Sequence, residues 1–462
     1  MDEVSLQFFG AVDTVTGSRF LVTYGQTRIL IDCGMFQGEP QVDALNNANF
    51  PIEESSINAI ILTHAHLDHC GYIPALAKNG FKGSIFCSDY TKQITEIVLL
   101  DAAHLQMQEE KFQSRKKHQD RNHRHLYNEK DVQSCLLLFK SLQVRFRTEV
   151  LPNIFVTLYP SGHILGATFV LLEIGGKSLL FSGDLGPGNH PFLVGPDSAP
   201  EQKIDAVITE STYGDREHDT PLLDFARELN IAIDRGGSIL IPVFTVDRTE
   251  EILFELRRLF SEGSVKNLPV FLDSPMGETV LSRYRDAFSN EAIDVKPEVL
   301  TLLKGTDPFD PGQLREMYTV DESKELNNIS EQSIVISSSG MSTGGRVTFH
   351  LQHMLPDPRN TVIIVGYQAR GTRGLALERG AKEIRLHGDL IPVQAYVVDV
   401  ESFSVHADQK ELLSWLKSID HPTNTFIVHG ERTSQEALKV VIENQLGWKV
   451  TIPILLRSYP IT

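Results

Sequence analysis

The densest group of reactive side chains is one hexapeptide, residues 64–69, which reads His-Ala-His-Leu-Asp-His. Imidazole and carboxylate groups together suit borderline divalent metals, zinc first and manganese second. We expect His64 and His66 to share one ion, and Asp68 and His69 to bind another, so two metal sites fit better than one. The alternative is a chance cluster on a solvated loop, which the rarity of histidine disfavours.

One turn cannot complete two coordination shells, so further ligands must come from elsewhere in the chain. His163, Asp184 and His429 each follow, or lie between, apolar strand-like runs, and each has a glycine nearby. Glycine lets the backbone come close to an ion. Taken singly, each of these residues fits a hydrogen-bonded structural role better. Together they indicate one metal centre built from distant parts of the chain.

The elements that position these ligands can be read from hydrophobic patterning. The β-branched run 57–63 is too short for a helix and predicts a strand that ends at the hexapeptide. A long polar helix is expected from about residue 91 to 121. Further along, strands such as 238–241 and 269–272 alternate with amphipathic helices such as 248–260, which indicates a parallel sheet with crossover helices.

The C-terminal region predicts a return to the first domain. After about residue 393 the chain runs through a strand, a helix over 409–419 and another strand to His429. Because His429 must reach the same metals as His64, the middle of the chain is an insertion. We expect one domain over residues 1–210 and 394–462, interrupted by an inserted domain over 211–393.

Composition limits the class of protein. The 462 residues are 41% hydrophobic, enough for two or three cores, and no run is long enough for a membrane span. The four cysteines form no short paired motif, and the start lacks the basic flank of a secretory signal, so we expect a cytoplasmic protein with reduced thiols. A net charge of −17 opposes nucleic-acid binding overall, but residues 366–388 have five Lys/Arg against two Glu.

With these motifs the chain resembles the β-CASP branch of the metallo-β-lactamase superfamily, a group of nucleic-acid-processing hydrolases. The motifs of the branch occur in order over almost the whole chain: Asp32, the 64–69 cluster, His163, Asp184, Glu210, His406 and His429. The resemblance implies an α/β fold, an αββα sandwich with an inserted β-CASP domain that contains a mainly parallel sheet flanked by helices. The insertion is expected to cover the metals and to admit only a single strand of nucleic acid, not a base-paired helix.

The resemblance also implies roles for individual residues. His64, His66, His163 and Asp184 would bind the first zinc ion, and Asp68, His69, Asp184 and His429 the second, with Asp184 bridging. The two zinc ions would activate a hydroxide that attacks phosphorus, with manganese as the alternative metal. His406 would be the general acid, Glu210 would orient it, and Asp32 would steady the ligand loop.

RNA is the expected substrate, because RNA-cleaving members of the branch have histidine at the position of His429, where DNA-processing members usually have valine. The expected RNA contacts are Ser337, Ser338, Ser339 and Arg346 in a Ser/Gly loop that precedes a helix, with Arg370 and Arg373. The branch more often has glycine at the position of Asp247. A carboxylate there is expected to alter the neighbouring surface or a contact of Arg248.

The interpretation is thus a metal-dependent ribonuclease acting on single-stranded RNA, with internal and terminal cleavage both open. A small-molecule metallohydrolase of the lactamase or glyoxalase type and a non-catalytic RNA-binding subunit are the alternatives, and DNA cleavage is disfavoured. No membrane partner is expected, and a homodimer stays open.

Overall fold

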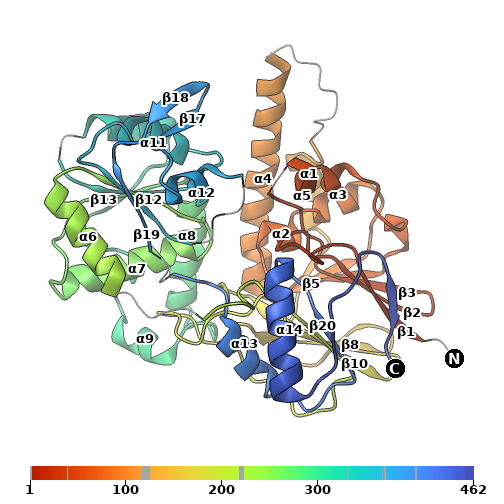
Figure 1. Cartoon of the computed structure of the whole chain (residues 1–462). Helices are drawn as coiled ribbons and strands as arrows, with labels where there is room; N and C mark the ends of the chain where they lie inside the picture. The colour runs from red at the N-terminus through yellow and green to blue at the C-terminus, as the bar shows by residue number, and fades with distance from the viewer. Residues whose placement is uncertain are drawn as a thin grey trace. The chain divides into compact units, whose positions relative to one another are not determined.

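The protein forms two compact units, here seen in a computed structural model (Figure 1). The structure describes residues 3–38, 40–115, 125–217, 223–329, 331–366, 368, 371–400 and 403–462. Unit 1 consists of Met1–Glu217 and His406–Thr462, and unit 2 of His218–Val405. The chain therefore leaves unit 1, forms unit 2 and returns. The domain limits expected at residues 210 and 393 stay a prediction.

Unit 1 contains two mixed sheets of seven strands each. The first sheet has, in spatial order, β22 (Ser458–Pro460), β1 (Val4–Phe8), β2 (Phe20–Tyr24), β3 (Thr27–Ile31), β4 (Ala59–Ile61), β5 (Ser84–Cys87) and β6 (Phe139–Ser141). The second has β21 (Val450–Thr451), β20 (Asn424–Ile427), β11 (Ala206–Thr209), β10 (Lys177–Phe181), β9 (Thr168–Ile174), β8 (Ile154–Pro160) and β7 (Thr148–Leu151).

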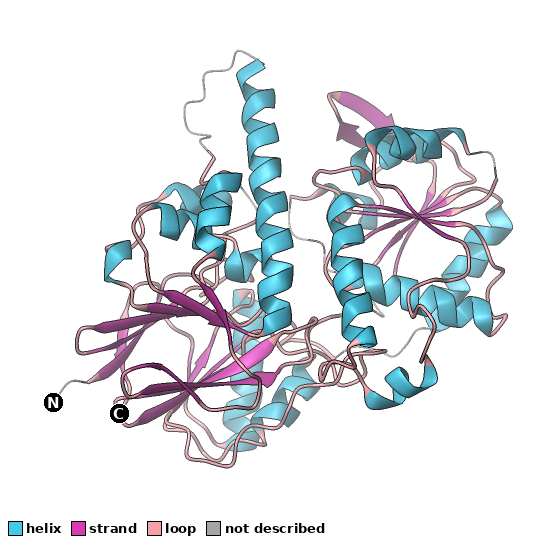
Figure 2. Cartoon of the chain, turned by 180° about the vertical axis from the view of Figure 1, so that it is seen from behind, coloured by secondary structure: helices cyan, strands magenta, loops and turns pink. Residues whose placement is uncertain are grey.

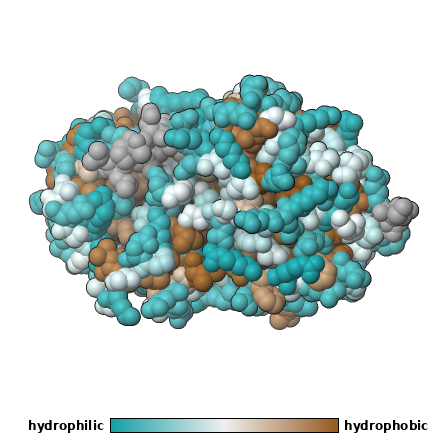
Figure 3. Space-filling model, turned by 90° about the horizontal axis from the view of Figure 1, so that it is seen from below, coloured by the Kyte–Doolittle hydropathy of each residue, from teal (hydrophilic) through white to brown (hydrophobic). Residues whose placement is uncertain are grey.

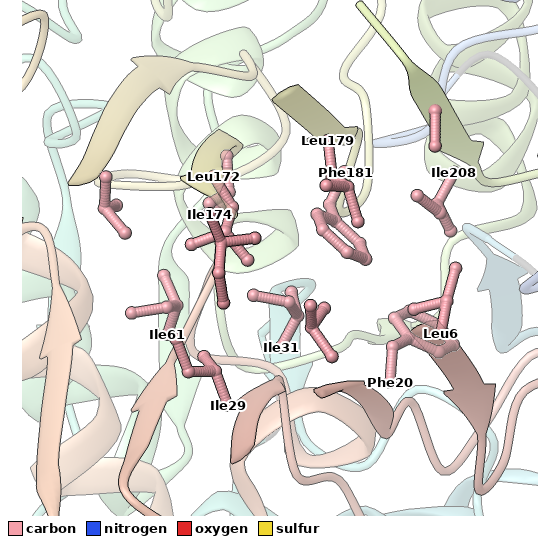
Figure 4. Packing of buried hydrophobic residues seen from close by; sticks show 14 of the residues in the cluster. Leu6, Phe20, Ile29, Ile31, Ile61, Leu172, Ile174, Leu179, Phe181 and Ile208 are labelled. Atoms are coloured by element: carbon pink, nitrogen blue, oxygen red, sulfur yellow. The ribbon is translucent and has the colours of Figure 1, made fainter. Parts of the chain in front are cut away.

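The core of unit 1 lies between the two sheets. Leu6, Phe20 and Ile31 of the first sheet face Leu172 and Phe181 of the second, and all are buried (Figure 4). Alternate residues of a strand point to one face, so each sheet gives one apolar face to this core. The helical segments of unit 1 are α1 (Pro40–Asp43), η1 (Ala44–Asn47), η2 (Glu54–Ser56), α2 (Leu67–Cys70), α3 (Ile73–Lys78), α4 (Asp89–Arg115), α5 (Glu129–Leu136), α13 (Gln409–Leu416) and α14 (Arg432–Leu446).

Helices cover the outer faces of the sandwich. Helices α13 and α14 pack on the second sheet through Leu412, Trp415 and Leu438, and α3, α4 and α5 lie beside the first sheet (Figure 2). The predicted αββα sandwich is therefore confirmed.

Unit 2 is built on a sheet of six strands in which every neighbouring pair is parallel. Its spatial order is β14 (Leu314–Glu316), β13 (Val270–Asp273), β15 (Ile334–Ser337), β12 (Ile239–Pro242), β16 (Thr361–Ile364) and β19 (Tyr396–Asp399). Its helices are α6 (Leu223–Arg235), α7 (Arg248–Ser261), α8 (Pro275–Ser289), α9 (Pro297–Leu302), α10 (Val320–Glu325), η3 (Leu326–Asn328), α11 (Val347–Met354) and α12 (Arg373–Glu378), and a separate hairpin joins β17 (Glu383–Leu386) to β18 (Asp389–Pro392). The predicted parallel sheet flanked by helices is confirmed.

One strand ends earlier than its pattern predicts. Strand β4 stops at Ile61. The Leu62 N–H still donates to the Phe86 carbonyl oxygen of β5, but the Thr63 N–H donates to an Asp32 carboxylate oxygen rather than to a neighbouring strand. The long polar helix begins at Asp89 and is described to Arg115. The expected end at residue 121 lies outside the described residues.

Asp247 was expected to alter the neighbouring surface or a contact of Arg248, and the first of these is wrong because the residue is buried. Its side chain is buried and accepts a hydrogen bond of 2.8 Å from the Tyr284 hydroxyl. Its φ of +71° lies in the region that favours glycine, so the backbone at this position explains why glycine suits it. Arg248 pairs with Glu251, three residues along the same helix.

Hydrophilic residues cover most of the molecular face in Figure 3. Within the described part of the chain, no helix combines the length and apolar composition needed to cross a membrane.

Glu278, in the first turn of α8, is a buried carboxyl group whose two oxygens have no hydrogen-bond partner among the described residues. Burial raises its pKa to about 7 from the usual value of 4.5, and the nearby Glu316 and Asp273 carboxylates act in the same direction. The folded state thus holds a proton that the unfolded chain releases above pH 4.5, so stability falls as the pH rises from 4.5 to about 7.

We expect Glu278→Gln to stabilise the protein by about 1–2 kcal/mol above pH 7, because the amide carries no charge to bury. The gain should shrink towards zero below pH 4.5, where the wild-type carboxyl is protonated in both states. Urea unfolding midpoints at several pH values measure the difference, with Glu331→Gln as an exposed control. A gain that does not depend on pH would contradict the explanation.

Candidate metal centre

The candidate site of unit 1 lies where strands of both sheets end. Asp32 and His64 come after the parallel strands β3 and β4 of the first sheet. Asp184, Glu210 and His429 come after β10, β11 and β20, which are parallel neighbours in the second sheet. The carboxyl ends of parallel strands meet at one edge, which is where α/β sheets commonly bind ligands.

The first group of side chains brings together His64, His66, His163 and Asp184. The His163 Nε2 atom lies 3.0 Å from His66 Nδ1 and 3.5 Å from Asp184 Oδ2. The His64 Nε2 atom lies 3.4 Å from the same Asp184 oxygen. These are the four residues that were expected to bind the first ion.

The second group brings together Asp68, His69 and His429. The His69 Nε2 atom lies 3.3 Å from His429 Nε2 and 3.9 Å from Asp68 Oδ2. The same Asp68 oxygen is 3.2 Å from His429 Nε2. His429 is therefore beside the early hexapeptide although 360 residues separate it from His69.

The Asp184 carboxylate stands between the two groups and gives one oxygen to each. Its Oδ2 atom faces His64 and His163, whereas its Oδ1 atom lies 3.3 Å from His69 Nε2 and 3.5 Å from His429 Nδ1. This is the arrangement that a carboxylate bridging two ions requires.

The geometry of these residues fits divalent metal ions. Ligands of a tetrahedral zinc ion with Zn–N bonds of about 2.0–2.1 Å are about 3.3 Å apart. The nitrogen and oxygen atoms of both groups show separations of 3.0–3.5 Å, apart from 3.9 Å between His69 Nε2 and Asp68 Oδ2. His64 Nε2 and Asp184 Oδ1 are buried without a hydrogen-bond partner among the described residues. Buried polar atoms usually have partners, so their convergence indicates a cation as the missing one.

Asp32 holds the hexapeptide by three contacts. Its two carboxylate oxygens accept hydrogen bonds of 2.8 Å from the Thr63 N–H and the Thr63 hydroxyl, and the His69 Nδ1–H donates to Asp32 Oδ2 at 2.7 Å. This contact directs the other ring nitrogen of His69, Nε2, towards the second group.

His406 lies at the rim of the same site and remains partly accessible, with 17% of its side chain exposed. Its Nδ1 atom is 3.3 Å from Glu210 Oε1, and that oxygen also accepts a 2.7 Å bond from the Leu185 N–H. Burial disfavours the charged ring, but the Glu210 carboxylate raises the pKa of His406 to about 9.

Electrostatics keeps His64 and Asp184 in forms that bind cations, whereas the Asp184 and Asp32 carboxylates overcome the effect of burial and raise the pKa of His69 well above its usual value. Burial lowers the pKa of His64 well below its usual value, so its ring is neutral. Burial opposes the charge of Asp184, but His429, His69 and His64 together lower the pKa of this carboxyl well below its usual value.

Glycine is required where loops of the site touch. A Cβ atom at Gly34 would lie 1.5 Å from the Asp68 carbonyl oxygen, and one at Gly186 would lie 1.8 Å from the Gly162 carbonyl oxygen. The expected close backbone approach beside His163 and Asp184 is therefore present.

Most of the unit 2 side chains that were expected to contact RNA make hydrogen bonds or ion pairs within the protein. Ser337 is buried and donates to the Asp273 carbonyl oxygen, and Ser338 lies 2.8 Å from the Ser274 hydroxyl. Ser339 is half-buried, 3.2 Å from the Thr343 hydroxyl.

The two arginines hold the Ser/Gly loop, residues 337–346. Arg346 pairs with the Asp273 carboxylate at 2.6 Å and donates to the Met317 carbonyl, and Arg373 donates to the carbonyl oxygens of Ser342 and Thr343. Arg370 lies outside the described residues. RNA contacts by these side chains stay a prediction.

Three residues of the site were not found from the sequence. Thr63 binds Asp32, Ser18 Oγ lies 3.3 Å from His69 Nε2, and Thr212 Oγ1 lies 3.1 Å from His429 Nδ1. Thr63 directly precedes the motif residue His64, and Thr212 lies two residues after Glu210, so their proximity to the motifs could have indicated them. Ser18 has no motif residue next to it in the sequence, so only the folded structure shows that it belongs to the site.

Comparison with known proteins agrees with the fold and with a metal-dependent hydrolase. Residues 13–242 match the Metallo-beta-lactamase superfamily, residues 249–377 the Beta-Casp domain, and residues 390–453 the Zn-dependent metallo-hydrolase RNA specificity domain. "Ribonuclease TTHA0252" of Thermus thermophilus is 36% identical over 93% of this chain and 94% of its own length.

Two archaeal relatives are also similar over most of the chain. The "RNase J-like protein" of Methanocaldococcus jannaschii is 30% identical over 99% of this chain and all of its own length. The "Transcription termination factor FttA" of the same organism is 30% identical over 93% of this chain and 67% of its own. A crystal structure of a protein of unknown function from Enterococcus faecalis has the same fold, with a TM-score of 0.55, 14% identity and 99% of this chain covered.

The fold and the gathered ligands define a metallohydrolase that binds divalent metal. The chain belongs to the metallo-β-lactamase superfamily, among its members with a Beta-Casp domain.

Proposed function

We propose that this chain is a metal-dependent ribonuclease that hydrolyses phosphodiester bonds of single-stranded RNA with two divalent ions, zinc being the preferred metal. The observation that carries the proposal is the position of the Asp184 carboxylate, which directs one oxygen towards each ligand group. The match of residues 390–453 to an RNA specificity domain and the two ribonuclease relatives support RNA as the substrate.

Seven side chains would hold the metals. One ion would bind His64, His66, His163 and Asp184, and the other Asp68, His69, His429 and Asp184. When bound, such a pair stabilises negative charge on the phosphate and lowers the pKa of the attacking water to about 7. Asp32 serves this centre by fixing the tautomer of His69.

His406 would protonate the leaving oxygen of the RNA. Glu210 binds Nδ1 of the ring, which leaves Nε2 as the atom that donates the proton. The partly exposed position of the His406 side chain supports this role, because the donor must reach a substrate atom.

The two alternative functions have less support. A small-molecule hydrolase does not account for the matches to the Beta-Casp and RNA specificity domains, which span residues 249–377 and 390–453. A non-catalytic RNA-binding subunit does not account for the complete ligand set. The homodimer and the cytoplasmic location stay predictions.

The test is incubation with end-labelled RNA that carries a 5′-triphosphate or a 5′-monophosphate, with zinc or manganese added. We expect cleavage of single-stranded RNA that is faster than cleavage of blunt duplex RNA or of single-stranded DNA of the same sequence, and that stops when a chelator removes the metal. The product ladder distinguishes internal from terminal cleavage. Cleavage that survives chelation, or equal rates on single-stranded and duplex RNA, would contradict the proposal.

A further inference from the structure

An exposed pair of stacked rings stands on the surface of unit 2. The rings of Phe349, on α11, and His387, in the turn between β17 and β18, have centroids 4.2 Å apart and an interplanar angle of 17°. Phe349 is 54% exposed, and His387 is exposed as well. Single exposed apolar side chains are common, but a parallel pair of open rings presents a flat π surface to solvent.

The hairpin holds His387 in place. Leu386 is the register partner of Asp389, so His387 and Gly388 form a two-residue turn, and both have positive φ. Figure 1 shows this hairpin and α11 close together in unit 2.

The hairpin is also packed firmly against α11. Ile384 and Leu386 of β17 lie in one buried cluster with Val347 and Leu351 of α11. Since both rings sit on elements fixed by this cluster, the pair is ordered before any ligand arrives, which reduces the entropy lost on binding.

The charge around the pair differs from that of the whole chain. Residues 337–356 and 371–392 together have five Lys/Arg, of which Arg346 is paired with Asp273, against three Asp/Glu, whereas the chain has a net charge of −17. Lys382 and Arg385 of the hairpin are exposed, as are its carboxylates Glu383 and Asp389. Stacking rings beside cationic side chains are what proteins use to bind single-stranded nucleic acid.

The pair is connected to the Ser/Gly loop. Arg373 donates through Nε to the Arg385 carbonyl oxygen of β17 and through Nη1 to carbonyl oxygens of the loop. One guanidinium group therefore ties the hairpin to the loop in which RNA contacts are expected.

We propose that Phe349 and His387 form a stacking platform for the bases of single-stranded RNA, an inference that rests on the proposed ribonuclease function. The platform recognises the flat face of a base, so it tolerates any sequence but requires an unpaired base. Lys382 and Arg385 attract the backbone phosphates beside it.

The direct test uses Phe349→Trp as a reporter. The two natural tryptophans, Trp415 and Trp448, are each only 5% exposed, so a new exposed indole is distinguishable. The metal-loaded protein is mixed in a stopped-flow instrument with an oligoadenylate 12-mer, or with a fully abasic 12-mer that has the same number of phosphates. We expect the oligoadenylate to quench the new emission and the abasic strand to leave it unchanged.

The matched control is Phe146→Trp, because Phe146 of unit 1 is 58% exposed and has no stacked ring among the described residues. Its emission should not respond to either strand. Equal quenching of the Phe349→Trp reporter by both strands, or no quenching by oligoadenylate, would overturn the platform.

Binding measurements give a second readout. We expect Phe349→Ala and Phe349→Leu to weaken oligoadenylate binding by about 5- to 100-fold, the scale of one lost base stack, and Phe349→Tyr to bind like the wild type. Leucine that binds like phenylalanine would show that apolar contact alone matters and would overturn the proposal. Cleavage of the same RNA by the wild type is measured in parallel: cleavage without quenching rejects only the platform, and quenching without cleavage rejects only the ribonuclease function.

Discussion

Replacing Asp184 with asparagine is expected to abolish RNA cleavage, lowering the rate by at least about 10³-fold, and to deplete the bound metal. The carboxylate gives one oxygen to each ligand group, so an uncharged amide weakens both sites at once. The measurements are single-turnover cleavage of labelled RNA and metal content by mass spectrometry after gel filtration.

The control for this variant is Asp205→Asn, which also changes a buried carboxylate of unit 1, but one that binds Lys203 and the Ser178 N–H. This control should keep its metal and its activity. An Asp184→Asn protein that cleaves at the wild-type rate, or that retains a full complement of metal, would contradict the bridging role.

His406→Ala should slow cleavage of RNA by about 10²- to 10⁴-fold, the usual scale for loss of a general acid, while the metal content stays at the wild-type level. The physical reason is that the leaving oxygen of RNA is a poor leaving group without a proton. The Nδ1 atom of His406 lies closest to Glu210 Oε1, at 3.3 Å, with Asp184 Oδ2 at 3.9 Å, and His406 belongs to neither ligand group, so its removal leaves the metal ligands in place.

A substrate with a good leaving group separates proton donation from other effects. A p-nitrophenyl phosphodiester expels an anion that needs no proton, so we expect His406→Ala to cleave it at nearly the wild-type rate. An equal loss on both substrates would reject the role of proton donor, and a loss of metal would make His406 a ligand.

Much of the metal centre could be predicted from the sequence because its ligands come in short motifs after strands. His64, His66, Asp68 and His69 are consecutive or nearly so, and a strand pattern directly before them shows that they share one turn. The position of His429 could be predicted only by reasoning that it must return to the same ions. The structure places its Nε2 atom 3.3 Å from that of His69.

The features that could not be predicted depend on contacts between residues far apart in the chain. No pattern shows that Arg346 is paired with Asp273, 73 residues away, so its charge was expected to face RNA. The positive φ of Asp247 and the stacking of Phe349 on His387 are likewise set by tertiary packing. A residue type at a motif position thus predicts chemistry better than it predicts whether the side chain is free to perform it.

The central claim is that two divalent ions lie on either side of the Asp184 carboxylate. Its most direct test is a crystal of the zinc-loaded protein with anomalous diffraction measured on both sides of the zinc absorption edge. We predict two anomalous peaks, one among His64, His66 and His163 and one among Asp68, His69 and His429, with Asp184 between them. A single peak, or none within bonding distance of Asp184, would contradict the account.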